Sequence, residues 1–297
     1  MQAPLPDHDT LAADYRRDGY AVVPDVLDAD DITALVAETA QIARGNRGPV
    51  RGLVPVPDEI DDEAALARYL TVQFPHKASE LIRDRFLAHP RFLPLLTAVV
   101  GPNVKCMQSM LFMKPSGKPG QAWHQDEHFI PTRDRSLVGL WLAIDDATEE
   151  NGCIWVRPGS HADGILYPMA PHGSPDFDSG DQLTGTTDDT DPGIPVPVRS
   201  GSVLLFNGYL HHRSLPNRAP AGTFRRALVN HYMSAESMLP WHWDGRLAPS
   251  EDMRDVVLVA GVDPYGWKGT EDLTYAFLRA ETRDADDPLF DPDKQVY

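Results

Sequence analysis

Two short stretches constrain the fold of this chain most, because together they carry metal ligands that work only if the fold brings them into contact. The first stretch is Trp123-His124-Gln125-Asp126, and the second is the pair His211-His212. A His-x-Asp motif with a distant second histidine is the ligand set of the 2-His-1-carboxylate facial triad, which holds Fe(II) and leaves positions open for oxygen chemistry. We therefore expect a fold in which the two stretches meet.

The local geometry of the two stretches is compatible with a shared site. Side chains two residues apart on a β-strand point to the same face, so His124 and Asp126 can bind one ion side by side. Taken alone, the pair also fits a partly buried histidine whose tautomer is set by a nearby aspartate. Adjacent strand residues point to opposite faces, so only one of His211 and His212 is expected to bind, and the other is a surface or supporting residue.

A pair of arginines suggests a binding site for an anion. Arg225 and Arg226 begin an apolar strand, and alternation allows only one of them to face the interior. An arginine inside a core needs an anionic partner, because an unpaired buried charge is costly, and a carboxylate matches the guanidinium fork. The alternative is that both arginines lie at the solvated start of the strand.

The order of predicted elements favours an α+β fold that is mainly β. Helices are expected at 9–18, 28–42, 63–69, 78–88 and 90–100, with one more near 271–282. Strands are expected at 20–23, 104–113, 123–129, 137–144, 153–156, 196–199, 202–206 and 225–231. Helices followed by a run of strands with turn signals indicate an antiparallel sandwich or small barrel with helices packed on it.

We expect one domain over 1–297, because no repeat and no clear linker divides the chain. Its parts are a mainly helical segment at 1–101, a β core at 102–234 and a C-terminal extension at 235–297. Within the core, 163–194 is rich in Asp, Gly, Pro, Ser and Thr, and predicts a long, partly mobile surface insertion. The Gly- and Pro-rich loop at 45–60 is a candidate lid.

Composition excludes several classes of function. A formal charge of -17 disfavours nucleic acid and anionic membranes as partners. There is no long apolar run, and residues 1–10 lack the basic and apolar regions of a signal peptide, so we expect a cytoplasmic protein. Cys106 and Cys153 are too few for a disulfide framework and are expected to be reduced core residues. No feature of the sequence indicates an oligomeric state.

A set of ordered motifs resembles one known family. The matching text is Met110-Leu111-Phe112-Met113-Lys114-Pro115, Trp123-His124-Gln125-Asp126-Glu127-His128-Phe129, Trp141, Asn151-Gly152-Cys153-Ile154-Trp155-Val156-Arg157-Pro158-Gly159-Ser160-His161, His212, Ser214, Asn217 and Arg225-Arg226-Ala227. Each motif is weak alone, but their order across residues 104–232 is specific. The chain resembles the phytanoyl-CoA dioxygenase family, within the Fe(II)/2-oxoglutarate oxygenases. The resemblance implies a double-stranded β-helix, also called a jelly roll, which is cupin-like.

The resemblance also implies roles for individual residues. His124 and Asp126 match the first two iron ligands, and His212 matches the third, because Asn217 follows it at the family's spacing; His211 is the alternative. Arg225 matches the anchor for a carboxylate of 2-oxoglutarate, although its gap from His212 is slightly longer than usual, which leaves Arg226 open. Further residues match positions near the co-substrate: Ser214, Trp141, Gln108 and Met110. For Met110 and Trp141, plain core packing is the alternative.

The implied cofactors are Fe(II), the co-substrate 2-oxoglutarate and O2. The implied reaction oxidises a C–H bond of a small-molecule substrate, most commonly by hydroxylation, and releases succinate and CO2. Related halogenases lack the carboxylate ligand, so Asp126 favours oxygenation over halogenation. Desaturation, epoxidation and ring formation use the same residues.

The substrate is predicted only as a class. An acidic chain without a basic cluster favours a small metabolite over an acyl-CoA, and Trp123, His128 and Phe129 flank the ligands. Trp241 and Trp243 could reach the pocket from the C-terminal extension. Two other functions are considered: a cupin-like metal enzyme that does not use 2-oxoglutarate, and a non-catalytic jelly roll that binds a metabolite.

Overall fold

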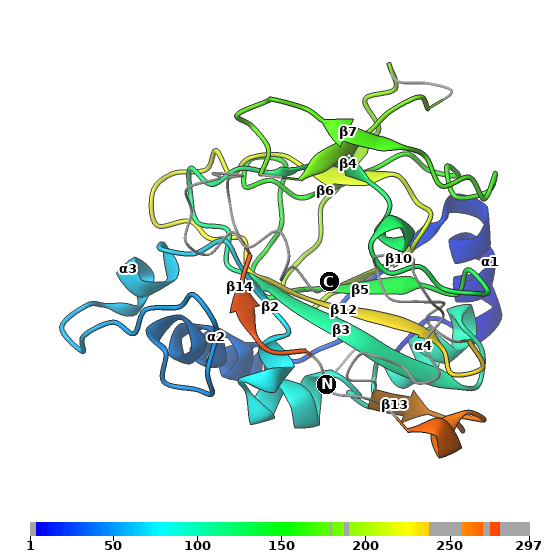
Figure 1. Cartoon of the computed structure of the whole chain (residues 1–297), viewed down its shortest axis with the longest axis horizontal. Helices are drawn as coiled ribbons and strands as arrows, with labels where there is room; N and C mark the ends of the chain where they lie inside the picture. Colours follow the sequence, from blue (N-terminus) through cyan, green and yellow to red (C-terminus); the bar gives the residue numbers. More distant parts are fainter. Residues whose placement is uncertain (1–3, 179, 187–189, 238–256, 270–273, 280–297) are drawn as a thin grey trace.

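Two antiparallel β-sheets stacked on each other form the core of the protein (Figure 1). The computed structural model describes residues 4–178, 180–186, 190–237, 257–269 and 274–279. The larger sheet has the order β1 (Tyr20–Val23), β10 (Val203–Asn207), β5 (Val138–Ala143), β12 (Ala227–Ser234), β3 (Val104–Phe112), β2 (Thr71–Gln73) and β14 (Phe277–Leu278), and β13 (Val257–Ala260) also pairs with β3. The smaller sheet has the order β4 (Gln121–His124), β11 (His212–Ser214), β6 (Ile154–Val156) and β9 (Ile194–Val196). This is the expected jelly roll.

Helices lie around the larger sheet, below it and toward its two sides in Figure 1, and pack in one apolar core with it. They are α1 (His8–Asp18), α2 (Ala29–Arg44), α3 (Asp62–Leu66) and α4 (Leu93–Val99). The first two begin at side-chain caps, since Asp7 accepts from the amides of Asp9 and Thr10, and Asp28 accepts from the amide of Asp31. Local capping signals explain why the first two helices were predicted to within two residues at each end.

The larger sheet separates two apolar cores, which explains its almost unbroken hydrophobic strands. On β5, Leu140 and Leu142 pack in the core between the sheet and the helices. Trp141 and Ala143, which alternate with them, pack in the second core between the two sheets. The run at 137–144 is therefore apolar because both faces of the strand are buried. The second core is the interior in which the functional side chains lie.

One glycine sets the spacing inside this interior. A Cβ atom added to Gly139 on β5 would lie 2.3 Å from the ring of Phe206 on the neighbouring β10. The Phe206 ring in turn lies 4.7 Å, centroid to centroid, from the ring of His212. Because Gly139 has no side chain, the Phe206 ring can pack against His212, a predicted metal ligand.

Several predicted elements differ from the structure. The strand expected at 123–129 ends at His124, and Asp126–His128 form a 3-10 turn, η3. The helix expected at 78–88 is shorter than predicted and consists mainly of a π-helical turn, Ile82–Phe86, and a 3-10 turn, Pro75–Lys77, precedes it. Strand β2 was missed, because three buried residues are too short to produce a periodic pattern.

Two predictions for the second half of the chain also differ from the structure. The insertion at 163–194 contains a hairpin of β7 (Met169–Pro171) and β8 (Asp181–Leu183), and β8 lies against β4. The helix expected near 271–282 is wrong where it can be checked, because Phe277–Leu278 form strand β14 beside β2. Pairing with a distant strand decided this conformation, and the remainder of 271–282 outside 274–279 lies beyond the described residues.

The larger sheet takes strands from all three parts of the expected domain. The segment 1–101 supplies β1 and β2, and the extension at 235–297 supplies β13 and β14. This sharing supports the single domain that the sequence predicts, which stays a prediction. Across the described residues, no helix combines the length and the apolar character needed to cross a membrane.

Candidate active site

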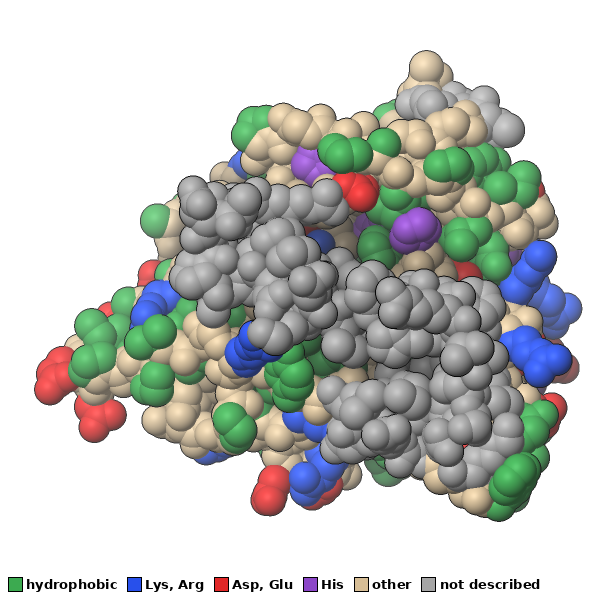
Figure 2. Space-filling model, in the orientation of Figure 1, with side chains coloured by type: hydrophobic (Ala, Val, Ile, Leu, Met, Phe, Trp, Pro, Cys, Tyr) green, Lys and Arg blue, Asp and Glu red, His purple; other side chains and the backbone are tan. Residues whose placement is uncertain are grey.

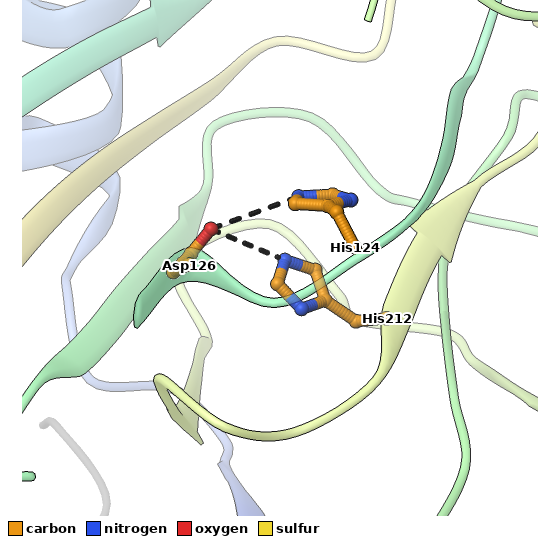
Figure 3. Close-up of side chains that lie close together, drawn as sticks. All are labelled: His124, Asp126 and His212. Atoms are coloured by element: carbon orange, nitrogen blue, oxygen red, sulfur yellow. Dashed lines mark ion pairs between the residues drawn. The ribbon is translucent and has the colours of Figure 1, made fainter. Parts of the chain in front are cut away.

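His124, Asp126 and His212 come together as a buried cluster in the interior between the two sheets (Figure 3). His212 lies directly opposite His124, because β11 pairs with β4 in that register. Oδ1 of Asp126 lies 3.6 Å from Nε2 of each histidine. Ligand atoms from all three side chains lie within 4.8 Å of one another, which is close enough to hold a metal ion.

Backbone hydrogen bonds set the tautomers of both histidines. Nδ1 of His124 lies 2.7 Å from the carbonyl of Ala122, and Nδ1 of His212 lies 3.0 Å from the carbonyl of Leu210. A carbonyl only accepts, so Nδ1 carries the proton in each ring and the lone pair of Nε2 is left toward Asp126. Burial, together with nearby His212, lowers the pKa of His124 to about 3. His124 is therefore a neutral imidazole, the form that binds metals.

Asp126 is held by a third histidine. Nε2 of His231, on β12, lies 3.0 Å from Oδ2 of Asp126. Burial acts to raise the pKa of Asp126, but the neighbouring His212 and His231 outweigh it and lower this pKa. Asp126 is consequently ionised at neutral pH. The sequence prediction assigned no role to His231, although its even spacing from Arg225, which directly precedes β12, places both on the same face.

The structure distinguishes the two adjacent histidines. His212 faces the cluster, whereas the ring of His211 packs edge-on against Tyr167, at 5.2 Å between centroids. Both histidines are buried, so the expectation that the second one could lie on the surface is wrong. A short strand between two layers of structure buries both of its faces, which alternation alone does not reveal.

Arg225 points into the interior, and Arg226 does not. Arg225 is 2% exposed, and its guanidinium lies over the ring of Trp141, 5.5 Å from the centroid. Arg226 instead forms two hydrogen bonds with the carboxylate of Asp145, at 2.8 and 2.7 Å. The partner Asp145 keeps Arg226 at the sheet margin, and alternation turns Arg225 inward.

Arg225 is a buried cation with an unused hydrogen-bond donor. Within the described residues it forms no ion pair with an acidic side chain, and its Nε has no hydrogen-bond partner. Burial lowers the pKa of Arg225 to about 10, which still leaves it charged at neutral pH. A buried guanidinium without a carboxylate is costly, so the site is suited to an anion with a planar carboxylate.

A second buried basic side chain, Lys114, lies beside Arg225. Its Nζ donates to Oγ of Ser214 at 3.3 Å, to the carbonyl of Gly152 at 3.4 Å and to the carbonyl of Leu215. Burial, followed by the charge of Arg225, lowers the pKa of Lys114 well below its usual range. Lys114 belongs to the matching motif at 110–115, but the sequence predicted no role for it. A guanidinium next to an amine that can take up a proton makes this end of the interior favourable for a dianion.

The other residues predicted near the co-substrate surround this interior. Ser214 lies two residues after His212 on β11, and its Oγ accepts from Lys114. Gln108 lies opposite His231 and donates to Oε1 of Gln73 at 3.4 Å. Met110 packs with Trp141 in the core between the sheets. Trp141 contacts the guanidinium of Arg225 directly, whereas Met110 contributes apolar packing.

The aromatic residues predicted to flank the metal divide between two faces. The ring of Phe129 lies 6.2 Å from the ring of His124, centroid to centroid. Trp123 lies on the other face of β4, and the guanidinium groups of Arg157 and Arg213 lie 4.5 and 4.6 Å from its ring centroid. Trp123 therefore does not line the metal site. The predicted contributors Trp241 and Trp243 lie outside the described residues.

Curated relatives carry the same family name as the motifs suggested. The phytanoyl-CoA dioxygenase family model matches residues 15–227. The chain is 31% identical to the peroxisomal phytanoyl-CoA dioxygenase of Rattus norvegicus over 235 residues, which are 75% of this chain and 67% of the rat protein. It is 34% identical to phytanoyl-CoA dioxygenase domain-containing protein 1 of Danio rerio over 154 residues, covering 51% of this chain and 52% of that protein.

Solved structures share the fold. The non-heme monooxygenase ThoJ is 22% identical with a TM-score of 0.64, covering 92% of this chain and 89% of ThoJ. The alpha-ketoglutarate-dependent epimerase SnoN, from nogalamycin biosynthesis, is 24% identical with a TM-score of 0.60, covering 78% of this chain and 85% of SnoN. The predicted cofactors, iron and 2-oxoglutarate, agree with the matched family and with the His124-Asp126-His212 cluster. On the match of its family model and the identity to its relatives, this chain belongs to the phytanoyl-CoA dioxygenase family of non-heme, 2-oxoglutarate-dependent oxygenases.

Proposed function

We propose that this protein uses Fe(II), 2-oxoglutarate and O2 to hydroxylate a C–H bond of a small-molecule metabolite. The observation that carries the proposal is the position of Arg225, a buried cation without an acidic partner among the described residues, in the same interior as the three-ligand cluster. A cupin-like enzyme without 2-oxoglutarate, or a non-catalytic jelly roll, has no use for this costly buried charge.

The ligand set suits iron with open positions. Nε2 of His124, Nε2 of His212 and Oδ1 of Asp126 would form one face around the ion, which is the 2-His-1-carboxylate arrangement. The hydrogen bonds at both Nδ1 atoms hold the rings in the orientation needed for this. When bound, iron and 2-oxoglutarate supply the oxidising chemistry, with succinate and CO2 as the products.

The remaining polar side chains would hold the co-substrate. Arg225 would pair with the carboxylate remote from the metal, and Trp141 and Ser214 would fix the position of the guanidinium and of Lys114. The apolar core around Trp141 keeps water from these charges, which strengthens their attraction for a carboxylate. Pre-set positions of this kind lower the entropy cost of bringing the reacting groups together.

A small metabolite remains the proposed substrate class. The rat relative is named for a CoA ester, but this chain has a formal charge of -17, which disfavours a polyanionic CoA group. Figure 2 shows a recess in the face toward the viewer, with two histidines, several hydrophobic side chains, an acidic side chain and a basic one near it. Such a lining fits a compact, partly apolar molecule. The cytoplasmic location stays a prediction from the sequence.

Epimerisation and ring closure are two reactions other than hydroxylation that such a site can carry out. The similar structures SnoN and SnoK are described as an epimerase and a carbocyclase, both from nogalamycin biosynthesis. These reactions and hydroxylation would use the same ligands and the same anion site. The three metal ligands are the same for all of these reactions, so only identification of the product distinguishes them.

Anaerobic addition of Fe(II) and 2-oxoglutarate tests the proposal. We expect the weak visible charge-transfer band of an iron-chelated 2-oxo acid, and its loss in His124→Ala and Asp126→Ala. Arg225→Ala should weaken 2-oxoglutarate binding at least about 10-fold, because a charge-assisted bidentate pair is lost.

Arg226→Ala is the matched control for Arg225→Ala. It removes the same side chain from the neighbouring position, where the partner is Asp145, and should leave the affinity for 2-oxoglutarate unchanged. Absence of the band in the unmodified protein, or equal effects of the two arginine substitutions, would show that the proposed function is wrong. Succinate release across a panel of metabolites then identifies the substrate.

A further inference from the structure

The two oxygens of the Asp126 carboxylate have different partners. Oδ1 lies 3.6 Å from Nε2 of both His124 and His212. Oδ2 points to the other side and lies 3.0 Å from Nε2 of His231. One oxygen therefore faces the three-ligand cluster, and the other is engaged by a histidine outside that cluster.

The direction of the hydrogen bond follows from the charge of Asp126. An ionised carboxylate only accepts hydrogen bonds, so Nε2 of His231 carries the proton and donates it to Oδ2. Nδ1 of His231 has no hydrogen-bond partner among the described residues, and the side chain is 3% exposed. His231 is thus a buried imidazole whose sole hydrogen bond found among those residues goes to a predicted metal ligand.

The fold holds His231 rigidly in this position. Strand β12 lies between β3 and β5, and His231 pairs with Gln108 on one side and with Gly139 on the other. The register of β12 with β3 shifts directly after His231, between it and Tyr232. The strand is therefore anchored on both sides up to this residue, so the imidazole cannot drift away from Asp126 without disturbing the sheet.

We propose that His231 is a positioning residue that limits Asp126 to one-oxygen coordination of the metal. By donating to Oδ2, it leaves only Oδ1 for the ion; a carboxylate with both oxygens free can bind through both and take a further position. Retaining that position matters because 2-oxoglutarate and O2 together need the three sites that the protein ligands leave open. This inference rests on the proposed function, since it concerns the same metal site.

The test uses Co(II) in the full-length protein, without 2-oxoglutarate or substrate. His231→Leu removes the donor but retains comparable bulk, and it should weaken Co(II) binding about 10- to 100-fold, as losing a group that supports a metal ligand does. The visible ligand-field spectrum of the bound Co(II) should also change, because the carboxylate is then free to use both oxygens. Neither readout depends on turnover.

Rescue and folding controls separate positioning from packing. His231→Gln has an amide donor that can reach Oδ2, so it should restore the spectrum and most of the affinity, whereas His231→Asn is too short and should behave like His231→Leu. If His231→Leu does not fold, the Gln and Asn pair decides the question. His89→Leu is the matched control, because His89 is a histidine packed beside Asp31 among the helices and should leave Co(II) binding unchanged.

The inference is overturned if His231→Leu or His231→Asn binds Co(II) with the affinity and spectrum of the unmodified protein. It is also overturned if His231→Gln is as impaired as His231→Asn, which would mean that the imidazole acts through packing alone. Failure of the proposed function gives a different result: the unmodified protein would show no charge-transfer band with Fe(II) and 2-oxoglutarate, whatever the Co(II) spectra of the variants.

Discussion

At the scale of single residues, the site depends on how a few buried polar atoms are satisfied. Carbonyls two residues earlier in the chain fix the tautomers of His124 and His212. Arg225, by contrast, is a buried cation whose Nε has no hydrogen-bond partner among the described residues, and Lys114 beside it is a buried amine with a lowered pKa. Groups of this kind are retained at a cost in stability, which favours a role in binding an anion.

Lys114 leads to a prediction about protons. Burial and the charge of Arg225 lower its pKa, and a carboxylate arriving beside it would raise that pKa again. Binding of 2-oxoglutarate should therefore be accompanied by proton uptake at pH values above the lowered pKa. Calorimetric titration in buffers of different ionisation enthalpy measures the number of protons taken up.

Lys114→Met keeps the length of the side chain and removes the titrating group. It should abolish the uptake and weaken 2-oxoglutarate binding several-fold, whereas Lys118→Met, a substitution on the neighbouring turn, should retain both. Uptake that persists in Lys114→Met would assign the proton to another group and contradict this prediction.

At the scale of elements, the functional residues lie on a few strands and are supported by the helical layer. Strand β12 follows Arg225 and carries His231, while β11 carries His212 and Ser214. Behind the larger sheet, α2 is tied to the segment that follows it through Glu38. That carboxylate accepts two hydrogen bonds from Arg47, at 2.7 and 2.8 Å, and one from Ser79 at 2.6 Å.

Glu38 leads to a prediction about stability and pH. Burial acts to raise the pKa of Glu38, but the hydrogen bonds from Arg47 and Ser79 outweigh it and lower this pKa from its ordinary 4.5. A carboxyl whose pKa is lower in the folded chain stabilises the fold above pH 4.5, and this contribution disappears as the pH falls through the lowered value. Glu38→Gln should therefore cost about 1 kcal/mol or more in unfolding free energy at neutral pH.

Urea unfolding of the two proteins across acidic and neutral pH measures this difference. The gap between unmodified protein and Glu38→Gln should narrow as the pH falls, because the native carboxylate is being protonated. Glu63→Gln, on the exposed surface of α3, is the control and should show little difference at any pH. A gap that stays constant with pH would rule out the ionised carboxylate as its cause.

At the scale of the whole molecule, segments far apart in the sequence close around the two sheets. The insertion at 163–194 rests on the smaller sheet, where the amide of Asp178 donates to the carbonyl of Gly120 at 2.8 Å. Asp178 also forms an ion pair with Arg279, which follows β14 at the edge of the larger sheet, at 2.9 Å. The Asp178 side chain is almost fully buried, so this pair links the insertion to the segment beside the larger sheet through a shielded contact.

The Asp178–Arg279 pair leads to a prediction about coupling between these segments. Arg279→Met should destabilise the protein by about 2 kcal/mol or more, because it leaves a buried carboxylate without its partner. Asp178→Asn added to Arg279→Met should recover part of that loss, which gives a favourable coupling energy in a double-mutant cycle. Chemical unfolding measures the four proteins, and limited proteolysis reports on the insertion. Strictly additive losses would contradict the coupling.

Much of the fold could be predicted because its signals are local. Side-chain caps at Asp7 and Asp28, turn residues at Asn151-Gly152 and apolar runs such as 137–144 mark elements without reference to distant residues. Strands β2, β7, β8 and β14 were missed, since each has only two or three residues. Pairing with another part of the chain, which no local pattern records, makes these segments extended.

The sequence by itself determined the chemical types at the site: two histidines and an aspartate for a metal, and an arginine for a carboxylate. Only the tertiary structure decided which of the adjacent residues face the interior. His212 faces the cluster because β11 pairs with β4, and Arg225 faces inward because Asp145 retains Arg226. The same packing places His231 against Asp126 and Lys114 beside Arg225. Residue type sets what a side chain can bind, but burial and strand register set what it meets.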